Sequence, residues 1–243
     1  MNWIWFHKLA SPPFAYAFAR QLRPWLFLPA IALMVWAAYK GLFVAPVDYQ
    51  QGDAYRIIYV HVPAATMSTV IYSAMAIAAG IGLIWRMKLA HAFAAACALP
   101  GVVFTALTLV TGSIWGRPMW GAYWVWDPRL TSELVLLFLY LGYMGLRASI
   151  DDIGRADRAS AVLAIVGLVD IPIIKYSVVW WNSLHQGPSL SLFHKSAIDA
   201  SMILPLLAMM LAYFLFFGAV ICDGICAEIV KRERNSRWLT ELG

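Results

Sequence analysis

The sequence predicts an all-α, polytopic membrane protein with six transmembrane helices and both termini in the cytoplasm. The chain of 243 residues is 62% hydrophobic and only 13% charged, whereas soluble domains carry about 25% charged residues. Its apolar runs of about 20 residues are long enough to cross a bilayer. Most of its Lys and Arg residues lie in the terminal segments and in alternate loops between those runs. These observations exclude a soluble enzyme, a secreted disulfide scaffold and a disordered tail.

The six spans form a single integral membrane domain that covers residues 1–243, since no soluble domain or repeat separates them. Pro63 suits the first turn of the second span, and Thr131 and Ser132 could cap the fourth. Nothing at the N-terminus has the pattern of a cleavable signal, so we expect the first run to remain as an anchor. We place the spans at about 25–44, 62–85, 92–114, 134–150, 161–181 and 202–222.

The distribution of positive charge predicts the orientation of the helices. Twelve of the 18 Lys and Arg residues lie near the termini or in the loops that follow the second and fourth spans. Four lie in the loops that follow the first, third and fifth spans. Lys and Arg collect in cytoplasmic loops, so we expect the opposite loops in the periplasm and the protein in a bacterial inner membrane. The net charge of +5 then reflects topology and contact with membrane lipid, and we expect no nucleic-acid partner.

Residues 115–131 form a tryptophan-rich periplasmic loop in this topology. The first fifteen read WGRPMWGAYWVWDPR, with four tryptophans among glycines and prolines. An interfacial belt accounts for scattered Trp and Tyr residues, but it does not require such a concentration in one loop. A stiff aromatic surface suits a large planar ligand, with arginines to pair with its anionic groups. The candidate platform residues are Trp115, Trp120, Tyr123, Trp124, Trp126, Asp127 and Arg129.

Two histidines lie on the same predicted side of the membrane as this loop. His61 stands at the outer mouth of the second span, and His185 lies in a turn-rich stretch after the fifth. A single interfacial histidine is usually an amphipathic side chain at the membrane surface. Two of them flanking an aromatic platform suit imidazole ligation of iron, and a flat ring with carboxylates and iron describes haem. His194 is a third candidate on that side.

Further polar residues are weaker candidates. Glu133, at the head of the fourth span, could cap a helix or face the haem, and we favour the cap. The alternative for the outer-loop residues is that they are simply solvated. Those that could contact a haem propionate or a partner are Arg117, Asp48, Gln51 and Arg56.

Asp170 lies close to the midpoint of the fifth span. A charge at that depth is costly and indicates a functional site. Lys175 is five residues away, so a direct pair would need a bend near Pro172. We expect Asp170 to pair with a neighbouring helix or subunit rather than to form a path for haem.

The tryptophan-rich segment resembles the WWD signature of haem-handling proteins in cytochrome c biogenesis. Within that superfamily, the chain length, the six spans and one outer histidine on each side of the motif are similar to the CcmC family, and the resemblance covers nearly the whole chain. It implies that His61 and His185 are the two axial haem ligands. The residues that match the signature are Trp115, Trp120, Trp124, Trp126, Asp127 and Arg129.

The resemblance implies a haem chaperone of system I cytochrome c maturation that is not an enzyme. Such proteins bind haem b transiently at the periplasmic face and promote its transfer to the carrier CcmE. They associate with CcmD and with the ABC-type pair CcmA and CcmB.

Two other functions are compatible with the residues. The chain could be the membrane subunit of a haem exporter, although only Lys40, Asp170 and Lys175 lie within the spans and no phosphate-binding loop is present to drive transport. A b-type electron-transfer protein would hold its histidines deeper within helices. No C-x-x-C-H motif occurs, so the chain is not a c-type cytochrome.

Overall fold

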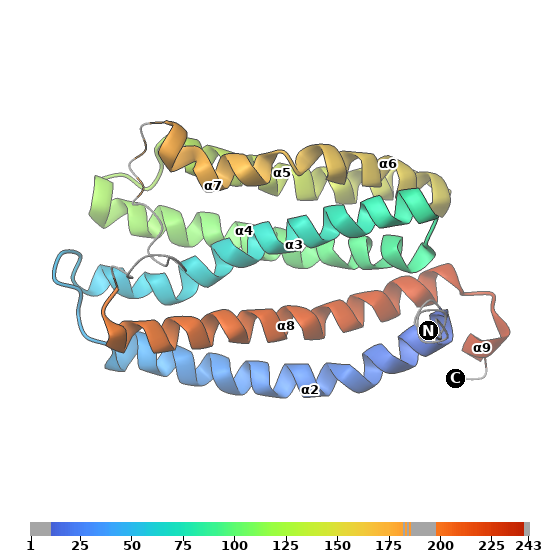
Figure 1. Ribbon diagram of the computed structural model, residues 1–243, viewed down its shortest axis with the longest axis horizontal. Helices are drawn as coiled ribbons and strands as arrows, with labels where there is room; N and C mark the ends of the chain where they lie inside the picture. The colour runs from blue at the N-terminus through green and yellow to red at the C-terminus, as the bar shows by residue number, and fades with distance from the viewer. Residues whose placement is uncertain (1–10, 182, 184, 186–197, 241–243) are drawn as a thin grey trace, which may run out of the picture.

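The computed structural model describes residues 11–181, 183, 185 and 198–240, which form an all-α bundle without strands (Figure 1). Six helical segments are long and apolar enough to cross a membrane, which confirms the predicted fold class. The helices are α2 (Pro12–Tyr39), continued by the π-helical turn η1 (Lys40–Val44), the 3₁₀ turn η2 (Asp53–Ile57), α3 (Ile58–Trp85), α4 (Lys88–Trp120), α5 (Pro128–Ala148), α6 (Ile153–Gly167), α7 (Asp170–Trp180), α8 (Ala200–Arg232) and α9 (Arg237–Thr240).

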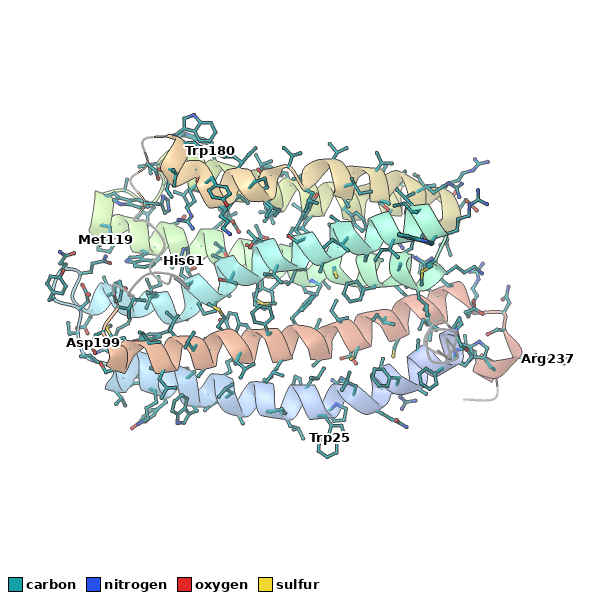
Figure 2. The ribbon with its side chains drawn as sticks, in the orientation of Figure 1. Trp25, His61, Met119, Trp180, Asp199 and Arg237 are labelled. Carbon is teal, nitrogen blue, oxygen red and sulfur yellow. The ribbon has the colours of Figure 1, made fainter. Side chains whose placement is uncertain are left out.

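The bundle has two distinct ends. α2 begins and α8 ends at the same end, where α9 also lies (Figure 1). We call this the basic end, because Lys231 and Arg232 close α8 there. His61, Met119 and Asp199 lie toward the opposite end (Figure 2), which we call the histidine end. The described ends of the chain therefore share one side of the bundle, as an even number of spans requires.

Helices α3 and α4 form the centre of the bundle, and α2 lies at its edge against α8 (Figure 1). About half of the apolar window of α3 and of α4 is buried, compared with 17% for α2. The buried residues of α2 are all alanines, namely Ala19, Ala30 and Ala37. Small residues allow membrane helices to approach closely, so α2 packs on α8 through this stripe and leaves its larger side chains to lipid.

Several predicted boundaries are wrong by about two to four helical turns. α2 begins at Pro12 instead of near 25, and α8 ends at Arg232 instead of near 222. α5 begins at Pro128 instead of near 134, and its N-cap is Asp127 rather than Thr131 or Ser132. The Asp127 carboxylate accepts a hydrogen bond from the Arg129 N–H at 2.9 Å, and a proline fits the first helical position because its missing N–H has no partner there. Pro63 does not open the second span, which already begins at η2.

The fifth span consists of two helices with a break at residues 168–169. Pro172 has no N–H to donate to the Leu168 carbonyl, and its ring crowds that carbonyl, so the helix is interrupted just before the proline. The helix is therefore broken near the position where a direct pair of Asp170 and Lys175 would need a bend. The break does not bring Asp170 and Lys175 together: Asp170 is buried, and the exposed Lys175 ammonium lies 5.8 Å from the centre of the Tyr176 ring.

Candidate functional site

The tryptophan-rich segment is divided between two helices and a short loop. Trp115 and Trp120 lie in the last two turns of α4, which ends at Trp120 and has Gly121 as its C-cap. Gly121 has φ +78°, a left-handed conformation that glycine adopts readily at a helix C-terminus. Its N–H donates to the Arg117 carbonyl at 3.1 Å. The loop therefore covers only residues 121–127, which corrects the predicted loop of 115–131.

Two contacts with α4 hold the ring of His61 in place. Its Nδ1 lies 2.9 Å from the Thr111 hydroxyl oxygen. That hydroxyl donates to the Leu107 carbonyl at 2.7 Å, so its oxygen accepts from the Nδ1–H of His61. The ring also meets the edge of Trp115, with 5.5 Å between centroids. A Cβ on Gly112 would lie 3.1 Å from His61 Cε1, so the glycine makes room for the imidazole.

The first loop at the histidine end is connected to Trp115. The Trp115 indole N–H donates to Gln51 Oε1 at 2.9 Å. Asp48 accepts the backbone N–H groups of Gln50 and Gln51, at 2.9 and 2.7 Å, and so shapes the turn that presents Gln51. Of the four weaker candidates, Gln51 thus contacts the platform directly and Asp48 supports it.

Arg56 and Arg117 are engaged elsewhere. The Arg56 guanidinium pairs with Asp53 at 2.9 Å and donates to the Gly41 carbonyl at 3.1 Å, which joins η2 to η1. Arg117 donates to the Gly121 carbonyl, and its guanidinium carbon lies 5.6 Å from the centre of the Tyr123 ring. Both arginines stabilise local backbone, and Arg117 and Tyr123 lie on the exposed surface of the segment.

Asp127 organises the surroundings of His185. Its Oδ1 lies 2.9 Å from His185 Nδ1, within ion-pair distance although without an aligned hydrogen bond. Its Oδ2 accepts from the Ser183 hydroxyl at 2.7 Å. The Trp120 ring packs edge-on against His185, with centroids 4.7 Å apart. One carboxylate, buried to 5% exposure, therefore caps α5 and holds the histidine.

His185 is predominantly neutral at neutral pH. Burial lowers its pKa from the ordinary value of 6.5, and the Asp127 carboxylate opposes that shift without cancelling it. The nearby Arg129 guanidinium also lowers the pKa. A neutral imidazole is the form that can donate a nitrogen lone pair to a metal.

The structure brings both predicted histidines to one end of the bundle. His61, His185 and Arg129 lie close enough for their charges to interact. Trp115 and Trp120 contact one histidine each. The other two tryptophans pair with each other instead: Trp124 and Trp126 meet edge to face at 5.5 Å, and Trp126 is exposed.

The donor groups at this end suit haem. Each histidine has its Nδ1 beside an oxygen, on Thr111 for His61 and on Asp127 for His185. Two imidazoles, indole rings and a half-buried arginine are the side chains that bind iron, a porphyrin face and a propionate. His194 lies outside the described residues, so its predicted role cannot be placed in the site.

Two features of the histidine end were not predicted from the sequence. Glu133 is not a helix cap; it is buried, with its carboxylate beside Ser68 of α3. The oxygens beside the histidines, on Thr111 and Ser183–Asp127, were not anticipated. An Asp-Pro pair before an apolar run could have located the start of α5, but no sequence signal identified Thr111 or Ser183.

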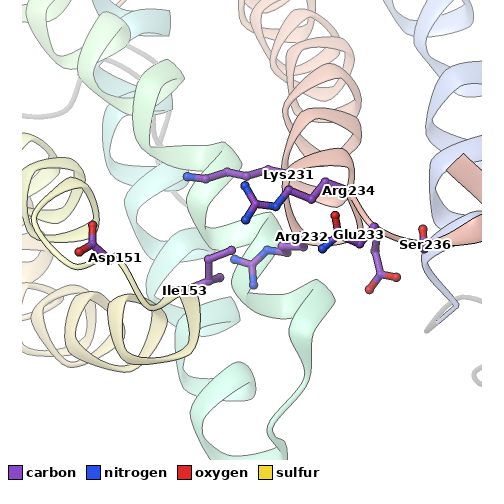
Figure 3. Close-up of a pocket in the computed structure, with 8 residues that line it drawn as sticks. Asp151, Ile153, Lys231, Arg232, Glu233, Arg234 and Ser236 are labelled. Atoms are coloured by element: carbon purple, nitrogen blue, oxygen red, sulfur yellow. The ribbon is translucent and has the colours of Figure 1, made fainter. Parts of the chain in front are cut away.

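A pocket at the basic end provides a contrast. It has a volume of about 540 Å³ and is lined largely by charged side chains from the start of α6 and the end of α8, including Asp151, Lys231, Arg232 and Arg234 (Figure 3). The end of α8 and the start of α6 lie at the other end of the bundle (Figure 1) from His61 (Figure 2). This pocket is therefore separate from the haem site that the sequence predicts.

Comparisons with known proteins agree over nearly the whole chain. Residues 5–240 match the family model CcmC, described as Heme exporter protein C. The chain is 46% identical to Heme exporter protein C of Escherichia coli K12 over 240 residues, which cover 99% of this chain and 97% of that protein. It is 42% identical to the protein of that name from Haemophilus influenzae, with 99% and 98% covered. It is 44% identical to that of Bradyrhizobium diazoefficiens, with 94% and 86% covered.

Proposed function

The chain belongs to the CcmC family and is a multi-pass membrane protein that handles haem in cytochrome c biogenesis, and from this we propose that it is a haem chaperone rather than an enzyme. It binds haem b transiently at the histidine end and promotes the transfer of the haem to the carrier CcmE. The histidine end faces the periplasm, and the basic end faces the cytoplasm, as the distribution of Lys and Arg predicts.

The arrangement of the two histidines is the observation that carries this proposal. A metal-binding histidine commonly donates its second ring nitrogen to a carboxylate, a carbonyl or another oxygen, which orients the ring. Here Thr111 accepts from Nδ1 of His61, and Asp127 lies at Nδ1 of His185. An oxygen thus lies at Nδ1 of each ring, which favours Nε2 as the nitrogen for iron.

The remaining side chains hold and shield the macrocycle. Trp115 and Trp120, which pack against the histidines, exclude water beside the ligands, and Arg129 binds a propionate. The exposed Trp126 provides an aromatic surface on the outside of the site, where the carrier approaches. These residues bind and orient haem without forming or breaking a covalent bond.

Membership in the family also implies other subunits of the Ccm system. We propose CcmD and the ABC-type pair CcmA and CcmB as partners within the bacterial inner membrane, and CcmE as the acceptor. The large exposed side chains of α2, such as Trp25 and Leu28, face lipid or a partner helix.

Optical spectroscopy of the purified protein tests the proposal. The wild type should show the Soret and α bands of bis-histidine haem, and His61→Ala and His185→Ala should each alter them and abolish covalent haem on co-expressed CcmE. His91→Ala is the matched control, because His91 is a buried histidine at the basic end; it should leave the spectrum unchanged. A Trp120/Trp124/Trp126 triple alanine variant should also lose carrier loading.

The alternative is a membrane subunit of a haem exporter, which the buried carboxylates Glu133 and Asp170 within the spans favour. If the wild type purified intact without haem and loaded the carrier equally well without either histidine, the chaperone function would be wrong. The exporter function would then become the leading hypothesis.

A further inference from the structure

A group of buried polar side chains lies deeper in the bundle than the histidine site. Glu133 of α5 is 4% exposed, Asp170 at the start of α7 is 7% exposed, and Tyr72 of α3 is fully buried. Asp170 lies close enough to Glu133 and to Tyr72 for its carboxylate to act electrostatically on both groups. Three helices therefore direct oxygens into one region inside the membrane.

These oxygens are short of partners. Among the described residues, Glu133 Oε1, Asp170 Oδ2 and Tyr72 Oη have no hydrogen-bond partner, although Ser68 lies within hydrogen-bond distance of the Glu133 carboxylate. Leaving a buried carboxylate unpaired is energetically costly. The helices enclose the tyrosine hydroxyl tightly, since a Cβ on Gly167 would lie 2.1 Å from it. Something other than these side chains must therefore satisfy the oxygens.

The balance of charge around the group points to a proton. The other titratable groups that face it are Arg129 from α5 and Tyr140, whose ring meets Tyr72 at 5.0 Å. Among the described residues, Arg129 is the only cation whose charge acts on Glu133, and it also interacts with Asp127. Asp170 has no cation acting on it among the described residues. One guanidinium therefore faces two carboxylates, with a third deeper in the bundle.

The group is connected to the histidine site through Arg129. Arg129 and Glu133 are four residues apart on α5, so their side chains lie on the same face, about 6 Å apart along the helix axis. Arg129 also influences His61 and His185. An anionic group that pairs with Arg129 at the histidine site competes with Glu133 for the same positive charge.

We propose that Glu133, Asp170 and Tyr72 form an intramembrane proton-binding site that takes up a proton when haem binds at the histidine end. The proposal rests on the proposed function, since the two haem propionates are the anions that compete for Arg129. The proton comes from bulk water and converts one carboxylate into a carboxylic acid. No electron is transferred, and the added negative charge is compensated inside the membrane.

The first test uses haem-free protein and infrared spectroscopy. A carboxylic acid has a carbonyl stretching band that a carboxylate lacks. We expect this band in the wild type, with a pH-dependent intensity, and its reduction in Glu133→Gln and in Asp170→Asn. Asp223→Asn is the matched control, because Asp223 is an exposed carboxylate that pairs with Arg23. If Glu133→Gln does not fold, Tyr72→Phe removes only the hydroxyl and should shift the frequency of the band.

The second test measures protons during haem binding. Haem is titrated into weakly buffered detergent solutions of each variant, and a pH-indicator dye reports the protons taken up. We expect the wild type to take up more protons per haem than Glu133→Gln, by up to one, and Asp223→Asn to match the wild type. Equal uptake in the wild type and in Glu133→Gln would overturn the coupling to haem.

The outcomes separate this proposal from the proposed function. A protein that shows the carboxylic acid band but binds no haem would overturn the chaperone function and leave the proton-binding site in place. A protein that binds haem but shows no such band at any pH at which it stays folded would overturn the proton-binding site. Haem binding that instead depends on Na⁺ concentration would assign these oxygens to a metal cation and would also overturn it.

Discussion

The two ends of the bundle satisfy their buried charges in different ways. At the basic end, Arg232 donates to Asp157 through both terminal guanidinium nitrogens, at 2.7 and 2.9 Å. Arg147 also donates to Asp157, and Glu228 accepts from Arg147 at 3.1 Å and lies 3.2 Å from Arg232. Toward the histidine end, the Glu133 and Asp170 carboxylates each retain an oxygen that has no partner in the described part of the chain.

This difference distinguishes a structural network from a site prepared for a ligand. A closed set of two cations and two anions joins α5, α6 and α8 and needs nothing further. Unpaired oxygens and oriented imidazoles, in contrast, carry a cost that a bound group can offset. Mutations at the basic end should therefore change the stability of the protein, and mutations at the histidine end should change haem binding.

The largest expected effect is at the basic end. Asp157→Ala leaves Arg147 and Arg232, which are mostly buried, with Glu228 alone. Removing one partner of a buried ion pair costs about 3–5 kcal/mol, so the midpoint of thermal unfolding in detergent should fall markedly. Haem bound per folded protein should not change. An unchanged unfolding midpoint would show that water replaces the carboxylate and that the network is not structural.

At the histidine end, Asp127→Asn should weaken haem binding without unfolding the protein. Asparagine is as good an N-cap as aspartate, so α5 retains its first turn, while His185 loses the carboxylate at 2.9 Å. Loss of such a group beside a metal ligand typically costs about 10- to 100-fold in affinity. The haem dissociation constant and the unfolding midpoint are measured together. A lower midpoint with unchanged affinity would assign Asp127 to capping alone.

The pH dependence of the same variant provides a separate measurement. The pKa of His185 is lowered by burial, so its neutral form contributes stability and binding above the ordinary pKa of about 6.5, and this contribution is lost as the pH falls. The Asp127 charge opposes the shift, and its removal should lower the pKa further. The haem dissociation constant of Asp127→Asn should therefore begin to rise at a lower pH than that of the wild type. A rise at higher pH would contradict this account.

Two glycines allow a matched comparison with a smaller expected effect. Gly112 of α4 faces His61, and Gly82 of α3 faces His91 at the basic end. A Cβ at Gly112 would lie 3.1 Å from the His61 ring, so Gly112→Ala must displace the imidazole slightly, at a cost of about 1 kcal/mol. It should alter the Soret band and weaken haem binding several-fold. Gly82→Ala, with a contact of 2.6 Å, should destabilise the fold and leave the haem spectrum unchanged.

The sequence predicted the six spans well, because each depends on a local property, the length of an apolar run. The boundaries at the histidine end were less predictable. α4 continues through Trp120, although Pro118 and the surrounding glycines indicated a loop. Local composition does not reveal that Trp115 and Trp120 pack against histidines from α3 and from the segment after α7, and such tertiary contacts decide whether a marginal helix extends.

The haem site was predictable in its ligands but not in their supports. Histidines beside an aromatic segment carry a chemical signal, and the resemblance to a known family reinforced it. Thr111 is an ordinary polar residue within an apolar helix, and its role follows only from its 2.9 Å contact across α3 and α4. Glu133 was assigned to a cap because it stands near a helix start, whereas burial against α3 determines its environment.

The smallest expected effect comes from the contact between the first loop and the platform. Gln51→Leu keeps much of the side-chain volume but removes the acceptor of the Trp115 indole N–H. One half-exposed hydrogen bond contributes about 0.5 kcal/mol, so haem affinity should fall by about twofold and stability should barely change. Trp115 stays in place because it also packs against Tyr55 and His61. A loss as large as that of Asp127→Asn would mean that Gln51 contacts the haem itself, and that the first loop belongs to the binding site rather than to its support.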